Sequence, residues 1–313
     1  MKNLNPVKMI TKTYEKMSTW GKILLFIVLF LIVISIMNSF RRVKEGFQQI
    51  DQFILKSGSD VYDDFYADVY DELVFNNLKD EYEVGEIVNK TSPTTESVIV
   101  DIGSGTGHHV AKLSSQGYKN VIGVDKSDAM VNKAKEMYPQ LNFKQGDATD
   151  ASILKPNTAT HLLCLYFTIY YIKDKSQFFK NAMNWLMPGG YLIVHIVDRD
   201  MFDPILPPGN PLILVSPQRY AKKRITHTKI TFDDMEYASD FELDARNNMA
   251  LFKERFKSKE DGKVRKNEHV MYMDSEAEIT AMAQNEGFIL AGKVDLIKCY
   301  YEYQYLYIFQ KPE

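Results

Sequence analysis

The residues best suited to chemistry lie in a short glycine-rich segment. The apolar run 98–102 contains Asp101, and Gly103, Gly105 and Gly107 follow it at alternate positions. Such glycines let the backbone turn tightly and approach a ligand that side chains would block. A helix that begins near Gly107 would present free N–H groups and a positive dipole end to a carboxylate or phosphate. The segment is therefore either a ligand-binding turn or a plain strand-to-helix turn.

Two further acids follow later apolar runs. Asp125 closes the run 121–124, and an acid there can accept both ribose hydroxyls of a nucleoside that lies across the strand ends. Asp147 follows a third run and is placed to bind an adenine amino group. The dinucleotide fingerprint G-x-G-x-x-G fails because His108 stands where its third glycine would be. A nicotinamide oxidoreductase is therefore a remote alternative.

Alternating strands and helices must position these residues. We expect strands at 98–102, 121–124, 141–144, 161–166 and 191–197, with helices at 107–116, after Ser127 and at 178–186. This alternation predicts an α/β fold with a parallel sheet and helices on both of its faces.

The segment 200–273 has a different pattern of charged and apolar residues. Charged residues alternate with apolar ones as in antiparallel strands with one wet face, and strands are expected at 225–232, 235–244, 248–257 and 264–273. Ser275 and Glu278 form a capping box for a helix that Gly287 ends. Two last strands are expected near 289–296 and 299–309.

The ordered set of motifs resembles the class I S-adenosylmethionine-dependent methyltransferase family. In that family a D-x-G-x-G-x-G turn, a ribose-binding acid and an adenine-binding aspartate recur in this order, and the resemblance covers roughly residues 60–200. It implies a Rossmann-like seven-stranded sheet with an antiparallel β insertion, and S-adenosyl-L-methionine as cofactor. The residues it assigns to the cofactor are Asp101, Gly103, Gly105, Gly107, Asp125, Lys126, Met130, Asp147, Ala148 and Tyr66.

The resemblance also implies a role for each of these residues. The three glycines would line the methionine and ribose side, and Asp101 would support the loop and approach the amino group of the cofactor. Asp125 would hold the ribose and Asp147 the adenine amine, with Lys126 and Met130 near the adenine. An aromatic residue before the first strand often packs against the methionine tail; the candidates are Tyr62, Tyr66 and Tyr70, with plain core packing as the alternative.

Candidates for catalysis lie after the fourth strand and around the fifth. Tyr166, with Tyr170 and Tyr171 nearby, follows the fourth strand; His195 lies in the fifth and Arg199 after it. A histidine in an apolar strand is more often a satisfied core residue than a catalytic group. Arg199 would bind a substrate carboxylate or phosphate, or else pair with a neighbouring aspartate at the surface.

The stretch 195–206 and the antiparallel segment after it are loosely similar to small-molecule methyltransferases of the glycine/sarcosine N-methyltransferase type. This similarity supports a substrate-covering β element at 200–273 but not glycine as the substrate. Tyr237, His269 and Tyr272 lie in this element and are expected to be structural. The acceptor is expected to be a small molecule or lipid-like; a protein methyltransferase and a non-catalytic cofactor-binding scaffold remain alternatives.

The N-terminal region predicts a membrane anchor. Residues 23–37 hold one serine and no charge, and with their flanks they predict a transmembrane helix at 22–40. A cleaved signal peptide and a buried helix are the alternatives. This places an N-terminal tail at 1–21, a juxtamembrane helix or stalk at 41–60 and the methyltransferase domain at 61–313. Basic flanks lean slightly to a cytosolic N-terminus, but a cytosolic cofactor requires the catalytic domain of this single-pass protein to face the cytosol.

Charge and cysteine usage exclude some partners. The formal net charge of −3 argues against a nucleic-acid-binding surface. The two cysteines, Cys164 and Cys299, have no neighbour at C-x-x-C spacing. We therefore expect neither a disulfide framework nor a metal site.

Overall fold

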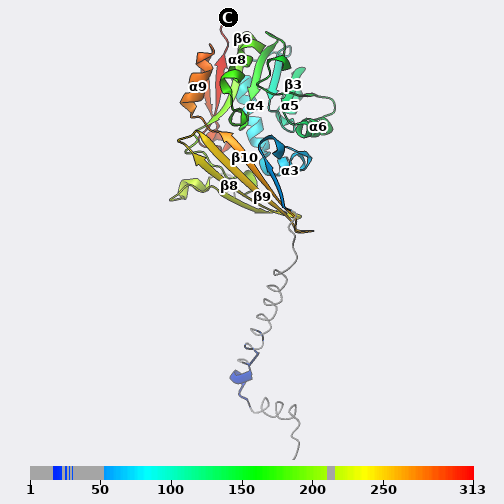
Figure 1. The fold of residues 1–313 in the computed structure, drawn as a ribbon, viewed down its shortest axis with the longest axis vertical. Helices are drawn as coiled ribbons and strands as arrows, with labels where there is room; N and C mark the ends of the chain where they lie inside the picture. The colour runs from blue at the N-terminus through cyan, green and yellow to red at the C-terminus, as the bar shows by residue number, and fades with distance from the viewer. Residues whose placement is uncertain (1–16, 23–24, 27, 29, 31–52, 210–215) are drawn as a thin grey trace, which may run out of the picture. The chain divides into compact units, whose positions relative to one another are not determined.

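The computed structural model describes residues 17–22, 25–26, 28, 30, 53–209 and 216–313 (Figure 1). The chain divides into two compact units, Met1–Asp51 and Gln52–Glu313. Most of the span expected at 22–40, and residues 41–52 of the expected stalk, lie outside the described residues. Among the described residues, no helix has the length and apolarity to cross a membrane.

A seven-stranded sheet organises the second unit, in the order β11-β12-β6-β5-β2-β3-β4. Strands β2 to β6 run parallel, whereas β12 is antiparallel to both β6 and β11. This arrangement confirms the predicted Rossmann-like α/β sheet. The bounds are β2 Val98–Ile102, β3 Asn120–Asp125, β4 Asn142–Gln145, β5 Ala159–Cys164, β6 Leu186–Val197, β11 Ile289–Asp295 and β12 Gln304–Gln310.

Helices cover this sheet, and polar side chains fix where several of them begin. The Ser127 hydroxyl accepts a hydrogen bond from the backbone N–H of Met130 at 3.1 Å and so caps α6. The capping box predicted for α9 is confirmed, since Ser275 and Glu278 bond each other's backbone N–H groups. The helices are α3 Asp64–Val74, α4 Asn77–Thr91, α5 His108–Ser115, α6 Asp128–Met137, α7 Thr168–Tyr171, α8 Lys175–Trp185 and α9 Glu276–Asn285.

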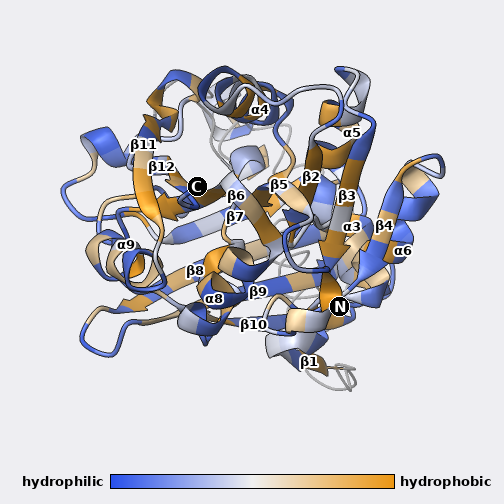
Figure 2. Cartoon of the chain, turned by 90° about the horizontal axis from the view of Figure 1, so that it is seen from above, coloured by the Kyte–Doolittle hydropathy of each residue, from blue (hydrophilic) through white to orange (hydrophobic). Residues whose placement is uncertain are grey.

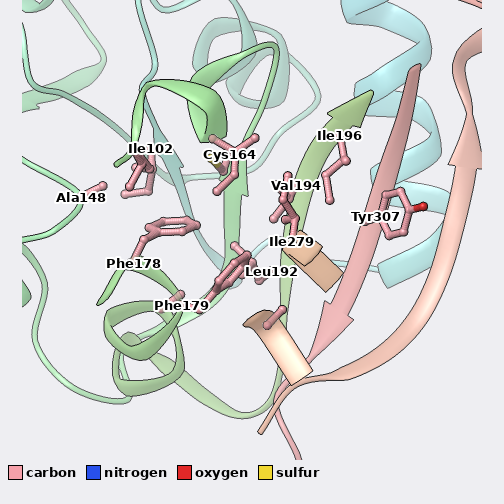
Figure 3. Packing of buried hydrophobic residues seen from close by; sticks show 14 of the residues in the cluster. Ile102, Ala148, Cys164, Phe178, Phe179, Leu192, Val194, Ile196, Ile279 and Tyr307 are labelled. Atoms are coloured by element: carbon pink, nitrogen blue, oxygen red, sulfur yellow. The ribbon is translucent and has the colours of Figure 1, made fainter. Parts of the chain in front are cut away.

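Two apolar clusters hold the helices to opposite faces of the sheet. On one face, α8 and α9 pack against β5 and β6, where Phe178 and Phe179 meet Leu192 and Val194 (Figure 3). On the other face, α4, α5 and α6 pack against β2 and β3. Hydrophobic residues concentrate along the strands between these layers (Figure 2). Burying each such large side chain stabilises the fold by about 1.5–3 kcal/mol, so the strand ends that carry the glycine loop are firmly held.

A second, five-stranded sheet lies beside the first, in the order β1-β10-β9-β8-β7 (Figure 1). Its strands are β1 Phe53–Ser57, β7 His227–Thr231, β8 Met235–Asp244, β9 Met249–Ser258 and β10 Val264–Tyr272. The antiparallel insertion predicted for 200–273 is thus present, and β8 has the predicted bounds. Alternate side chains of β8, β9 and β10 are buried, so one face of the insertion packs against the rest of the domain.

Strand β1 corrects one expectation. A helix or a stalk is expected at 41–60, with Phe53 and Ile54 at helical spacing, but Phe53–Ser57 is a strand that pairs in parallel with β10. The edge of β10 offers unpaired backbone groups, and the β-formers Phe53 and Ile54 begin the strand that satisfies them. The helix alternative is therefore wrong for these residues.

Candidate functional site

A cavity of about 1050 Å³ lies between the carboxyl ends of β2 to β5 and the five-stranded sheet. The glycine loop after β2 and the acids after β3 and β4 form one wall. Helix α3 contributes Tyr66 and Tyr70, and the five-stranded sheet contributes Phe241 and Phe252. Ligands of open α/β sheets bind at this edge, and eleven of the 38 residues that line the cavity are aromatic.

Asp125 joins the glycine loop to the start of α6. One carboxylate oxygen accepts a hydrogen bond from the Gly105 N–H at 2.9 Å, and the other accepts from the Ser127 N–H at 2.9 Å. Burial raises the pKa of Asp125 from its ordinary value, although these backbone N–H groups oppose the shift. Each oxygen keeps acceptor capacity for a hydroxyl group. Asp125, Gly103 and Gly105 all line the cavity, as predicted for a ribose site.

Asp147 lies near Asp125 on the cavity wall, since the Gly146 N–H donates to the Asp125 carbonyl at 2.9 Å. Its carboxylate pairs with the Lys126 ammonium at 2.8 Å and accepts from the Thr149 backbone N–H at 2.9 Å. Burial raises the pKa of Asp147, but the bonds from Lys126 and Thr149 outweigh it and lower the pKa to about 2. Met130 and Ala148 line the cavity beside it. The three residues predicted near the adenine, Lys126, Met130 and Asp147, therefore all line this cavity.

Asp101 lies behind the glycine loop in a recess of about 60 Å³ that Gly103 and Gly105 also line. Its side chain is 1% exposed, and neither carboxylate oxygen has a hydrogen-bond partner within the protein. Burial raises the pKa of Asp101 to about 7, and Asp125 and Asp80 add to the shift while His109 opposes it. An orphaned buried carboxylate suits an ammonium group. The residues present thus fit S-adenosylmethionine at its amino, ribose and adenine ends.

Gly107 has a different role from the one predicted. It does not line the cavity; it caps α5 with φ +92°, and a Cβ built on it would lie 2.6 Å from the Phe143 ring. Only glycine combines this left-handed backbone with so close a contact. Gly107 therefore serves the packing of α5 against β4, and its predicted contact with the methionine and ribose side is corrected.

Gly107→Ala is expected to lower the free energy of unfolding by about 2–5 kcal/mol, the sum of left-handed strain and overpacking. Gly117→Ala is the matched control because Gly117 has φ +96° and nothing within 4 Å of a built Cβ. The control should lose only about 1–2 kcal/mol, the backbone strain alone. Chemical denaturation of the full chain measures both, and equal losses would show that the Phe143 contact is unimportant.

His195 and Arg199 do not line the cavity. The buried His195 ring contacts the Tyr166 carbonyl through Nδ1 and the Gln304 side chain at 3.0 Å through Nε2. Burial lowers the pKa of His195 to about 4, so the ring is neutral at pH 7. His195 therefore contacts two residues that line the cavity, Tyr166 and Gln304, without lining it itself. The predicted catalytic role is corrected to a positioning role.

Arg199 ties the end of β6 to the insertion. Its guanidinium donates to the Asn248 side chain at 2.6 Å and to the carbonyls of Met273 and, at 3.3 Å, Ala245. These partners take both terminal nitrogens of the fork that was expected to bind a substrate carboxylate or phosphate, and Nε lies 3.9 Å from the carboxylate of the neighbouring Asp200, the ion pair expected as the alternative. The structure therefore assigns Arg199 to holding the turn between β8 and β9.

Tyr166 remains at the cavity as predicted. It has φ +51°, an unusual backbone for a bulky side chain, and its ring lines the cavity beside Phe167 and Thr168. Its carbonyl is held by His195. The strained backbone thus presents the phenol ring between the glycine loop and the insertion.

Sequence analysis missed Glu254 of β9. The inward-facing side of this strand carries Ala250, Phe252, Glu254 and Phe256, so an acid stands in an otherwise apolar row. A lone charge on the apolar face of an alternating strand is the signal that could have identified it. Tyr66, predicted at the cofactor, lines the cavity and donates its hydroxyl to Glu254 at 3.2 Å.

A cluster of buried charged side chains from α4 and α5 lies next to the glycine loop. Lys79 and Glu83 of α4 pair at 2.7 Å with side chains 3% and 0% exposed, and His109 contacts Glu83 at 3.0 Å. Asp80, Glu83 and His109 place three possible metal ligands within 4.8 Å of one another. Lys79 and His109 already balance these carboxylates, so the cluster is explained as an ion-pair network.

Comparison with known proteins agrees with this geometry. A family model described as a methyltransferase domain matches residues 99–190, which contain Asp101, the glycine loop, Asp125 and Asp147. Residues 99–190 match a methyltransferase domain, and the relatives and solved structures to which the chain is similar are methyltransferases. S-adenosylmethionine is the cofactor on which this class depends.

The methyltransferase domain has relatives of known name. It is 30% identical over 142 residues to a dTDP-4-amino-2,3,4,6-tetradeoxy-D-glucose N,N-dimethyltransferase of Saccharopolyspora spinosa, covering 44% of this chain and 56% of that protein. A trans-aconitate 2-methyltransferase of an Acidovorax strain is 29% identical over 36% of this chain and 43% of its own. The chain thus spans about half the length of the curated relatives it matches.

Solved structures share the fold of the methyltransferase domain. An S-adenosylmethionine-dependent methyltransferase from Clostridium acetobutylicum superposes with a TM-score of 0.60 at 17% identity, over 80% of this chain and 98% of that one. The S-adenosylmethionine-bound amino pentose methyltransferase CalS10 from Micromonospora echinaspora gives a TM-score of 0.56 at 16% identity, over 79% and 96%. At these identities the similarity shows the fold.

Proposed function

We propose that this chain transfers the methyl group of S-adenosylmethionine to a small-molecule amine. The observation that carries the proposal is one continuous cavity that reaches from Gly103, Gly105 and Asp125 to the aromatic side chains of the insertion. Sites for one drug-sized ligand occupy about 300–1,000 Å³, so about 1050 Å³ has room for a cofactor and a compact acceptor. The aromatic lining favours a partly apolar or cationic acceptor.

Methyl transfer needs positioning more than functional groups. The cofactor supplies a methyl group already activated by a sulfonium. The protein has to hold the acceptor atom in line with that methyl group and exclude water. Tyr166, Phe241 and Phe252 enclose the acceptor side, which supports both tasks.

The amine is suggested by two relatives. The S. spinosa protein is named for N,N-dimethylation of a dTDP-amino sugar, and CalS10 for methylation of an amino pentose. The aromatic side chains along the cavity favour such a molecule over a protein side chain. A lipid-like acceptor is the second candidate, because the apolar run 23–37 would hold the enzyme at a surface that carries lipids.

A methyl-transfer assay tests the proposal. The full chain is incubated with S-[methyl-³H]adenosylmethionine and, separately, a dTDP-4-amino sugar, simple primary amines, phosphatidylethanolamine vesicles and a histone mixture. Label in an amine-bearing small molecule is the expected result. Label in the vesicles would support the lipid-like acceptor, and label in the histones would support a protein methyltransferase. Bound cofactor without transfer to any acceptor would favour the scaffold alternative and contradict the proposal.

Cofactor binding at pH 7 is expected to release protons from Asp101. With a pKa of about 7, roughly half of these carboxyls carry a proton at pH 7, and a cationic amino group nearby would lower the pKa. Titration calorimetry in two buffers of different ionisation enthalpy should show that wild type releases up to about 0.5 proton more than Asp101→Asn at pH 7, and that the two proteins exchange equal numbers of protons at pH 9. Equal proton exchange by wild type and Asp101→Asn at pH 7 would contradict the assignment.

We also propose a single-pass membrane anchor at 22–40 with the catalytic unit facing the cytosol. Support comes from the uncharged run 23–37 and from Phe53, Ile54 and Leu55, which begin 16 residues after that run and whose side chains are about half exposed at 45–53%. The full chain should remain in the membrane fraction after high-salt washing. A chain lacking residues 1–42 should become soluble, and its retention in membranes would contradict an anchor confined to this segment.

A further inference from the structure

The carboxylate of Glu254 is a buried charge with four hydrogen-bond donors. It is 2% exposed; Oε1 accepts from the Tyr66 hydroxyl at 3.2 Å and the Tyr237 hydroxyl at 2.7 Å. Oε2 accepts from Asn267 at 3.0 Å and from His269 Nε2 at 2.7 Å. Burial raises the pKa of Glu254, but His269 and the other donors outweigh it and lower the pKa. Glu254 is therefore a fixed negative charge inside the insertion.

His269 connects this charge to the cavity. Its ring is 1% exposed, with Nε2 bonded to Glu254 and Nδ1 lying 3.2 Å from the Tyr171 hydroxyl. A carboxylate only accepts, so Nε2 must carry a proton. In the neutral ring Nδ1 then holds a lone pair, and Tyr171 donates to it. The ring is oriented as a base whose free nitrogen faces a tyrosine.

Tyr171 brings this chain of hydrogen bonds to the cavity wall beside the glycine loop. It ends α7 and lines the cavity. Thr168, one turn earlier in α7, contacts Gly103, with its hydroxyl 3.5 Å from the Gly103 carbonyl. The Tyr62 ring lies against Tyr171, with 5.7 Å between the ring centroids. The Tyr171 oxygen thus donates to His269 and keeps lone pairs for an acceptor molecule in the cavity.

We propose that Tyr171, His269 and Glu254 form a relay that takes up the proton lost by the N–H or O–H group of the methyl acceptor. The inference rests on the proposed function and adds the proton path to it. The acceptor's lone pair forms the bond to the methyl carbon while the carbon–sulfur bond breaks and its electron pair stays on sulfur. The acceptor proton passes to the Tyr171 oxygen, and the tyrosine proton passes to His269 Nδ1. The resulting imidazolium is balanced by Glu254.

The surroundings of His269 set which charges act on it. Glu254 faces it from β9, Tyr171 from α7 and Tyr66 from α3, and Tyr62 lies 5.6 Å away between ring centroids. The Phe252 ring of β9 also packs against His269, with 5.5 Å between the two ring centroids.

The next cation on the same face of β10 is already engaged. Arg265 bonds to Asp63 and to Asn267, each at 2.8 Å. Glu254 is therefore the charge in direct contact with the imidazole.

The protonation of His269 can be measured without any acceptor. The full chain has six histidines; ¹⁵N-histidine labelling and the His269→Gln variant assign the His269 signals. We expect the neutral ring to carry its proton on Nε2, and Tyr171→Phe should shift the Nδ1 signal. A neutral ring that carries its proton on Nδ1 would overturn the relay, because His269 could not accept from Tyr171.

The second readout is the pH profile of methyl transfer to an amine that turns over. General-base assistance contributes about 10²–10⁴-fold, so Tyr171→Phe should lower the rate at pH 7 by about 100-fold or more and recover at pH 9–10, where the amine arrives neutral. Glu254→Gln should act in the same direction. Tyr305→Phe, which removes a hydroxyl outside the cavity, should leave the profile unchanged.

The two proposals fail in different ways. If wild type binds no S-adenosylmethionine or methylates no acceptor, the proposed function fails, and the imidazole signals alone decide the relay. If methyl transfer proceeds and Tyr171→Phe keeps the wild-type rate and pH profile, the relay is overturned while the proposed function stands. A uniform rate loss without recovery at high pH would show a structural role and also overturn the relay.

Discussion

Asp125→Ala is expected to weaken S-adenosylmethionine binding by at least about 100-fold, or about 3 kcal/mol. The carboxylate is the proposed acceptor for the ribose hydroxyls, and it also holds the N–H groups of Gly105 and Ser127 at 2.9 Å. The variant therefore loses ligand contacts and the fixed shape of the loop together. Titration calorimetry of the full chain measures the affinity.

Two further variants separate these contributions. Asp125→Asn keeps the shape but loses the charge and one acceptor, so an intermediate loss of about 10-fold is expected. Asp128→Ala removes an exposed acid three residues away in α6, outside the cavity lining, and should bind as wild type does. Wild-type affinity in Asp125→Ala would refute the ribose assignment.

Glu83→Ala is expected to have the largest effect on stability, a loss of about 3–5 kcal/mol in the free energy of unfolding. Glu83 is 0% exposed, and its partner Lys79 is 3% exposed at 2.7 Å. Removing the carboxylate leaves a buried ammonium without its counter-charge. Glu81→Ala in the same helix is the control, because Glu81 pairs with Lys112 at 2.8 Å but is 53% exposed. Such an exposed pair contributes only about 0–1 kcal/mol.

The same cluster predicts that the free energy of unfolding falls at both low and high pH. Burial raises the pKa of Glu83, but Lys79 and His109 outweigh it and lower it from 4.5 to about 2, so this stability is present above pH 4.5 and lost as pH falls through about 2. Burial lowers the pKa of His109, but Asp80 and Glu83 outweigh it and raise it from 6.5 to about 9. That contribution is complete below pH 6.5 and lost as pH rises through about 9.

Denaturation of the full chain from pH 3 to pH 9 tests both decreases. In wild type the cluster should contribute most to the free energy of unfolding between pH 4.5 and pH 6.5. In Glu83→Ala the free energy of unfolding should depend less on pH on both sides of this range. If Glu83→Ala and Glu81→Ala lose equal amounts of stability, the buried pair is not holding α4 against α5.

The seven-stranded sheet was predictable from the sequence because its parallel strands are buried on both faces. Runs such as 98–102 and 121–124 are nearly continuous apolar stretches, and polar caps such as Ser127 mark where helices begin. The acids that end β3 and β4 were predictable for the same reason, since parallel strands bring their carboxyl ends to one edge.

Long-range pairing was not predictable in the same way. Strand β1 pairs with β10, some 200 residues later in the chain, and no local pattern in Phe53–Ser57 specifies that partner. The four donors around Glu254 come from α3, β8 and β10. Such a site exists only after the insertion has packed onto α3.

Packing also decided the residues whose roles differ from prediction. Gly107 belongs to the glycine motif, yet the nearby Phe143 ring is what requires a glycine there. Arg199 sits at the ligand-binding edge of the sheet, yet Asn248 and Met273 take its donors. Sequence spacing places a residue near an edge of the sheet, but it does not reveal which neighbour its side chain meets.

Calorimetric titration of the full chain with S-adenosylmethionine and, separately, with NADH tests the central claim most directly. The site geometry predicts micromolar binding of S-adenosylmethionine and no measurable binding of NADH. Binding of NADH alone, or of neither compound, would contradict the assignment of the cavity as a methyl-donor site.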